Sequence, residues 1–88
     1  MPSWEDLNKA KRAEPEPDAV AERCARVFGS PEGKMLLADF RVLTIEKEPP
    51  ANATDAQLRE LEGERKFVRR IEKLIARGHE QMEARSRK

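Results

Sequence analysis

The sequence has very few of the residue types on which catalytic and metal sites depend. It holds one cysteine (Cys24), one histidine (His79), one tryptophan and no tyrosine. A single cysteine excludes an internal disulfide and is typical of a reducing compartment. A catalytic dyad needs a nucleophile beside its base, whereas Cys24 falls on the apolar side of one expected helix and His79 in a basic tail. We therefore expect no enzyme, no metal site and no cofactor.

Long apolar runs are also missing. No stretch approaches the ~18 residues that span a bilayer, and the first twelve residues lack the apolar segment of a signal peptide. We expect a protein of the cytoplasm with no membrane partner. Of the 88 residues, 40% are charged and 38% hydrophobic, which is too charged for a thick core. A lone domain of this size is marginally stable, which favours a homo-oligomer or a bound subunit.

The net charge of +1 is the sum of two unequal ends. Residues 1–18 hold five acidic and three basic residues, a balance of −2, whereas residues 65–88 hold nine basic and three acidic residues, a balance of +6. This asymmetry favours contact of the C-terminal part with something acidic, either nucleic acid or protein.

Residues 1–17 are expected to form an N-terminal arm. A weak capping pattern at Ser3 and Asp6 predicts a short helix over residues 4–13, with Trp4 and Leu7 on one face. The run Glu14-Pro15-Glu16-Pro17 then favours extended backbone and is interpreted as a linker.

Residues 18–78 are expected to form the helical domain, which begins with two short helices. Asp18 is the predicted N-cap of a helix over residues 19–28, whose apolar stripe holds Val20, Cys24, Val27 and Phe28. Gly29 is the predicted left-handed C-cap of that helix. Ser30 as N-cap and Pro31 at the first helical position predict a second helix over residues 31–43. Its apolar set is Met35, Leu36, Leu37, Phe40 and Leu43.

A long helix is predicted from the capping-box signal Thr54 and Gln57 onward. Its broad apolar face holds Leu58, Leu61, Phe67, Val68, Ile71, Leu74 and Ile75. Gly78 is the expected end of its packed portion, and residues 79–88 are expected to be a basic tail, either as a fraying continuation of the helix or as a solvated segment. The fold class is therefore all-α: two short helices joined by a tight Gly-Ser-Pro corner, packed on one long C-terminal helix, with an extended N-terminal arm.

Two surfaces are candidates for partner binding. One is the polar face of the long helix, which carries Arg65, Lys66, Arg69, Arg70, Lys73 and Arg77. It could follow nucleic-acid phosphates, although it lacks aromatic residues to stack on bases, or it could bind an acidic protein. Plain solvation of this face is a third reading. The other candidate surface is the arm, where Trp4 and Leu7 could anchor a protein partner.

Two motifs together resemble a family of small bacteriophage proteins. The first is Phe28-Gly29-Ser30-Pro31-Glu32-Gly33, followed by Leu36-Leu37-Ala38-Asp39. The second is Leu61-Glu62-Gly63-Glu64-Arg65, followed by Val68 and Arg70-Ile71. Members of this family are encoded among the head and tail genes of short-tailed phages and prophages. The resemblance covers residues 22–77.

The resemblance implies a virion-associated or assembly protein with phage-encoded protein partners, made in the host cytoplasm and able to be carried in the virion. It also suggests a structural corner of Phe28, Gly29, Ser30, Pro31, Gly33 and Gly63. Close approach of the corner to Gly63 would explain a glycine within a long helix, which costs about 1 kcal/mol relative to alanine. Arg65 would then donate hydrogen bonds to the corner's carbonyls. Two alternatives stay open: a small phage protein that inhibits or redirects a host protein, and a DNA-binding accessory protein.

Overall fold

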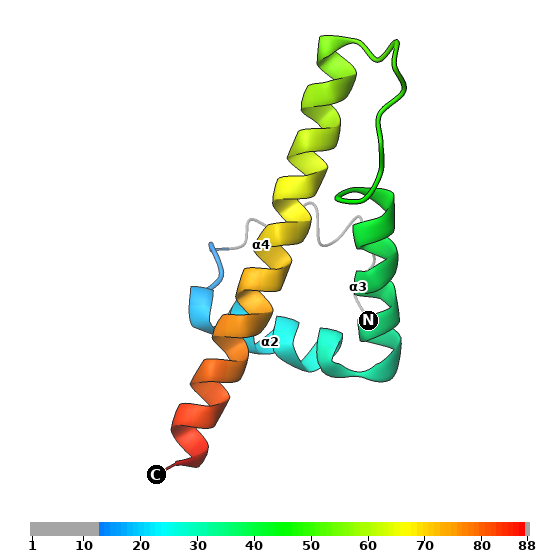
Figure 1. Cartoon of the computed structure of the whole chain (residues 1–88). Coiled ribbons are helices and arrows are strands. Elements are labelled where there is room, and N and C mark those ends of the chain that lie inside the picture. The colour runs from blue at the N-terminus through cyan, green and yellow to red at the C-terminus, as the bar shows by residue number, and fades with distance from the viewer. Residues whose placement is uncertain (1–12, 88) are drawn as a thin grey trace, which may run out of the picture.

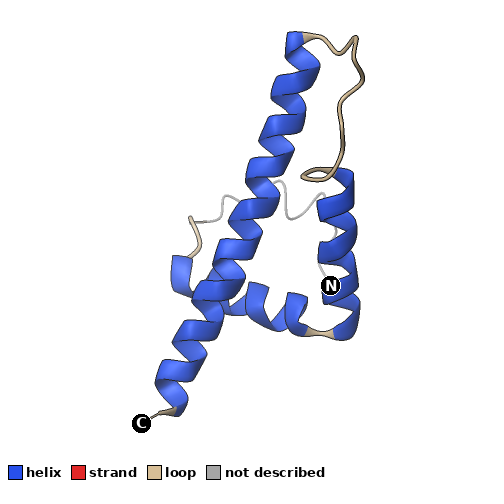
Figure 2. Ribbon diagram, in the orientation of Figure 1, coloured by secondary structure: helices blue, strands red, loops and turns tan. Residues whose placement is uncertain are grey.

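The structure is a computed structural model, and it describes residues 13–87 of the chain (Figure 1). Its element order is α2 (Pro17–Gly29), α3 (Pro31–Leu43) and α4 (Asp55–Ser86). Figure 2 shows helices and loops, and no strand, over these residues. The two short helices pack against the long C-terminal helix, as the sequence predicted. Most of the predicted helix over residues 4–13, including Trp4 and Leu7, lies outside the described residues.

Local caps set the ends of the helices. Ser30 accepts a hydrogen bond from the backbone N–H of Gly33 (3.0 Å), with Pro31 at the first helical position, which confirms the predicted start of α3. Thr54 and Gln57 form the predicted capping box at the start of α4. The start of α2 differs from the prediction, because Glu16 rather than Asp18 is the N-cap. The Glu16 carboxylate accepts from the backbone of the first turn, and Pro17 opens the helix.

Helix α2 crosses α4 at small residues (Figure 1). Ala21 and Ala25 are 0% and 2% exposed, and Gly78 of α4 is also buried. A Cβ on Gly78 would lie 2.7 Å from the carbonyl carbon of Ala21 and 2.8 Å from the Cβ of Ala25. The two backbones therefore meet at a distance that only glycine permits on the α4 side.

This crossing corrects two expectations. The packed portion of α4 does not end at Gly78, since the helix continues to Ser86 and Met82 is half-buried. The predicted stripe of α2 is also not its most buried side. Val27 is 57% exposed, because the two helices lie so close together at their contact that alanines, and not large side chains, fit between them.

The corner between α2 and α3 is tight, but its glycines act differently from the prediction. No described residue has a positive φ, so Gly29 is not a left-handed cap; it is the last residue of α2. Gly33 is the position of close approach, since a Cβ there would lie 2.7 Å from the Cα of Phe28. Gly63 has open space where a Cβ would stand, with nothing within 4 Å. The corner therefore does not pack on Gly63.

The core is thin, and on α4 it follows part of the predicted apolar face. Leu61, Val68 and Ile71 are 9%, 4% and 9% exposed. Several large apolar side chains elsewhere are mostly exposed: Val27, Met35, Leu36, Val42, Leu43, Leu58 and Phe67. Four of these seven lie on α3, because that helix meets α4 along only part of its length. Much of the apolar surface predicted for the core therefore faces outward.

Candidate interaction surfaces

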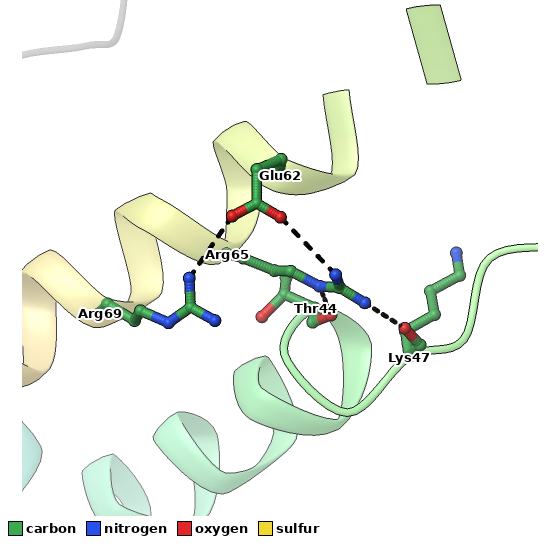
Figure 3. Close-up of polar contacts among 5 residues, drawn as sticks. All are labelled: Thr44, Lys47, Glu62, Arg65 and Arg69. Carbon is green, nitrogen blue, oxygen red and sulfur yellow. Dashed lines mark hydrogen bonds and ion pairs between the residues drawn. The ribbon is translucent and has the colours of Figure 1, made fainter. Parts of the chain in front are cut away.

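Of the six basic residues predicted to form a binding face, Arg65 makes the most hydrogen bonds to other parts of the chain. Its Nε donates to the carbonyl of Thr44 (2.9 Å), and an Nη donates to the carbonyl of Lys47 (2.5 Å) (Figure 3). Its side chain is 23% exposed. Arg65 donates hydrogen bonds to backbone carbonyls, as predicted, but not to the carbonyls that were predicted. The carbonyls belong to the turn after α3, not to the corner before it.

Two further residues of that face are paired within the chain. Glu62 lies between Arg65 and Arg69 and forms ion pairs with both, at 3.6 and 3.5 Å (Figure 3). Arg77 pairs with Asp18 at 2.5 Å, which links α4 to the first turn of α2. Such exposed pairs contribute at most about 1 kcal/mol each, but they orient the arginines toward their own chain.

The other three, Lys66, Arg70 and Lys73, are exposed and form no ion pair with a carboxylate of residues 13–87. Their spacing of four and three places them on one side of α4. We call these three residues the basic stripe. They are the part of the predicted face whose charge is available to a partner.

An open apolar groove of about 590 Å³ lies between α3 and α4, and the sequence reasoning missed it. Its walls are made by the C-terminal end of α3 and the middle of α4: Phe40, Leu43, Thr44, Gly63, Glu64, Phe67, Val68 and Ile71. Leu43 and Phe67, each 62% exposed, border it from opposite sides. The available signal was an excess of large apolar residues on α3 and α4 over what one small core can bury.

A second apolar surface lies on α3. Met35, Ala38 and Val42 are spaced by three and four, so they share one side of the helix, and all three are exposed. Met35 is 63% and Val42 58% exposed. Neither lines the groove. We call these three residues the outer face of α3. Trp4 and Leu7, the other predicted anchors, lie outside the described residues.

The residues considered for catalysis are on different helices. Cys24 is half-buried on α2, and His79 is exposed on α4. Over residues 13–87 no group of three or more His, Cys, Asp and Glu side chains is placed to hold a metal ion. In the same part of the chain, no helix has the length and apolar character needed to cross a membrane.

Comparison with known proteins matches the chain to a family model. The model of a family described as Bbp19-like phage protein matches residues 24–86, which include α3, α4 and most of α2. No curated protein matches the chain, and no solved structure matches it.

Proposed function

The chain belongs to the Bbp19-like phage protein family, and on this premise we propose that it is a non-enzymatic structural or assembly protein of the phage. In this proposal it docks on other virion proteins through apolar helical surfaces. The family supports the phage context. The observation that carries the docking role is the outer face of α3, where Met35 and Val42 expose more than half of their surface on a well-formed helix.

This surface suits a protein partner. Large apolar side chains gathered on one side of a helix cost solubility unless another surface covers them. An amphipathic helix that lays its apolar side into a partner's groove is a common mode of recognition. The outer face of α3 is rimmed by charged residues, Lys34 and Asp39 among them, which suits a contact that forms after folding.

The test is association with phage particles. A tagged chain is expressed during phage growth, and particles and assembly intermediates are purified by density gradient and analysed by mass spectrometry. We expect the chain in one of these fractions at a fixed ratio to other virion proteins. The Met35→Ser/Val42→Ser double variant should keep its helix content and lose this association, whereas Lys34→Ser should keep it.

Two other results would count against the proposal. If the chain is absent from particles and intermediates and instead co-purifies with one host protein, the host-directed alternative replaces it. If the double variant associates as well as the unchanged chain, the outer face of α3 is not the docking surface.

A DNA-binding accessory role is supported by the basic stripe alone. Three neighbouring cations can follow a phosphate backbone, and each neutralised phosphate steepens the salt dependence of binding. The other predicted contributors, Arg65, Arg69 and Arg77, are engaged within the chain. Binding to duplex DNA whose Kd rises steeply with salt would favour this role, provided that the Lys66→Ser/Lys73→Ser double variant no longer binds.

A further inference from the structure

The groove between α3 and α4 is an apolar surface that the described residues leave open, and it is separate from the outer face of α3. Leu43 and Phe67 border it, and each is 62% exposed. The hydroxyl of Thr44 donates to the carbonyl of Phe40 at 2.7 Å, so this polar lining group already has a partner. The one charged lining residue, Glu64, is exposed to solvent. The groove therefore suits an occupant with large apolar side chains.

The predicted apolar stripe of α2 lies on the side of that helix that faces the groove. Glu22 of α2 forms an ion pair with Arg85, which comes seven residues after Gly78 at the crossing. Glu22 is therefore on the side of α2 toward the C-terminal end of α4. Cys24, in the middle of the stripe, is two residues from Glu22, and at 3.6 residues per turn it points nearly the opposite way. The stripe, which is exposed or half-buried, thus faces the earlier part of α4, where the groove lies.

The chain enters the described structure on that same side of α2. Ala13 and Pro15 line a hollow together with Val20 and Arg23, which lie within the first two turns of α2. The residues before α2 therefore run back along the helix instead of leading away from it. Figure 1 shows them rising from the start of α2 toward the earlier part of α4. The chain that precedes Ala13 thus begins beside the apolar stripe of α2.

The groove is within reach of the residues that precede this point. Ile71, the lining residue nearest to the crossing, is seven residues from Gly78, which is about 10 Å along α4. Trp4 precedes Ala13 by nine residues, and a chain of nine residues spans up to about 30 Å. Leu7 is three residues from Trp4, a spacing at which two side chains can meet one surface.

We propose that the groove is occupied by residues 1–12 of the same chain, which fold back along the stripe of α2 and place Trp4 and Leu7 against Leu43 and Phe67. Tethering favours this occupant over a second copy. A segment on a short linker meets its site at an effective concentration in the millimolar range, whereas a second copy meets it only at the concentration of the protein. Trp4 and Leu7 then anchor their own chain, and the outer face of α3 stays open to other virion proteins.

Fluorescence of the full chain tests the proposal, because Trp4 is its one tryptophan. In the folded chain the emission should lie at shorter wavelength than in the urea-unfolded chain, and acrylamide should quench it less. The Leu43→Ser/Phe67→Ser double variant should lower the ratio of docked to undocked residues 1–12 at least about tenfold, which moves both readings toward those of the unfolded chain. Leu58→Ser, which changes an exposed apolar residue of α4 outside the groove, should leave both readings unchanged. Circular dichroism should show equal helix content in all variants.

A cross-link tests the place of docking. In a Cys24→Ser background, Asn8→Cys is combined with Gly63→Cys, since Gly63 lines the groove and has open space for a side chain. Mild oxidation at low protein concentration should form an intramolecular disulfide. It should form at least about tenfold faster than in the control that combines Asn8→Cys with Leu58→Cys, because a disulfide needs its two Cα atoms within about 7 Å.

Several results would overturn the proposal. One is a Trp4 emission equal to that of the unfolded chain. Another is an emission that shifts on dilution together with a sedimentation mass above 10.1 kDa, since the occupant would then be a second copy. Equal effects of the groove variant and Leu58→Ser, or equal cross-linking rates with Gly63→Cys and Leu58→Cys, would also overturn it. The measurements need no phage component, so they can fail independently of the virion role.

Discussion

Two glycines of α4 should respond in opposite directions to the same substitution. Both are helical, and replacement of either by alanine removes the entropic cost of glycine in a helix, which is about 1 kcal/mol. Gly63 has nothing within 4 Å of the position of a Cβ, so Gly63→Ala retains this whole gain. We expect the free energy of unfolding to rise by about 0.5 to 1 kcal/mol, which raises Tm by roughly 2 to 8 °C.

Gly78→Ala carries the same gain but adds a collision. Its Cβ would lie 2.7 Å from the carbonyl carbon of Ala21 and 2.8 Å from the Cβ of Ala25, where carbon atoms in contact prefer about 3.5 to 4.0 Å. Helix α2 must move away, which loosens the most closely packed contact of the fold. Overpacking of this kind costs about 1 to 3 kcal/mol and more where backbone must shift. The net result should be destabilisation by roughly 1 to 2 kcal/mol.

The two variants are compared by circular dichroism during thermal and urea unfolding. One low protein concentration is used throughout, so that self-association contributes equally little. Equal helix content at low temperature shows that both variants fold. If Gly78→Ala raises Tm as much as Gly63→Ala does, the backbones of α2 and α4 do not approach as closely as the structure places them, and the reasoning is refuted.

Three further substitutions test the corner between α2 and α3, the turn after α3 and the start of α4. Gly33→Ala should destabilise by about 2 kcal/mol or more, since the atoms it would meet are backbone of α2; its urea midpoint gives the value, and an unchanged midpoint contradicts the close corner. Arg65→Gln should cost about 1.5 to 3 kcal/mol by leaving the carbonyls of Thr44 and Lys47 without their charged donor. The rate of backbone amide hydrogen exchange should then rise mainly in residues 44–50; an equal rise along the whole chain would contradict this prediction. Thr54→Ala should lower the stability by about 1 kcal/mol through loss of the N-cap, and no change in Tm would contradict that.

The ends of the helices could be predicted where a cap is a local event. Ser30 with Pro31, and Thr54 with Gln57, bond to groups within three residues, so the sequence contains the whole interaction. The start of α2 was misplaced because Glu16 and Asp18 are both plausible caps; in the structure the Glu16 carboxylate accepts from the backbone N–H groups of Asp18 and Ala19. A choice of this size lies within the usual uncertainty of a helix end.

The packing was harder to predict, because apolar patterns rank large side chains as core. At the crossing of α2 and α4 the opposite holds, and alanine and glycine are the buried residues. Which of two glycines in one helix serves as the contact depends on where another helix passes. That position depends on how α3 and the connector after it are arranged in space, which a local pattern does not give even where it predicts the length of α3 correctly.

The candidate surfaces could be predicted only in part, because they too depend on contacts between segments that are far apart in the sequence. The sequence places six basic residues on the polar face of α4, but Arg65 and Arg77 have partners 21 and 59 residues away in the sequence. Only the structure separates these from the basic stripe. The groove could not be foreseen, because it exists only where α3 and α4 diverge enough to leave their facing apolar side chains uncovered.

A crossing built from small residues also explains why large apolar side chains can serve as surfaces. Ala21, Ala25 and Gly78 fix the position of α2 on α4 through close contact, with little apolar area of their own. The exposed large residues of α3 are then not required to hold the fold together, and Met35 and Leu43 can remain 63% and 62% exposed. Changes at those positions should therefore alter binding much more than folding, because they remove atoms that α2, α3 and α4 do not bury. Stability and recognition are placed on different side chains of the same short protein, which is what makes the surface variants interpretable.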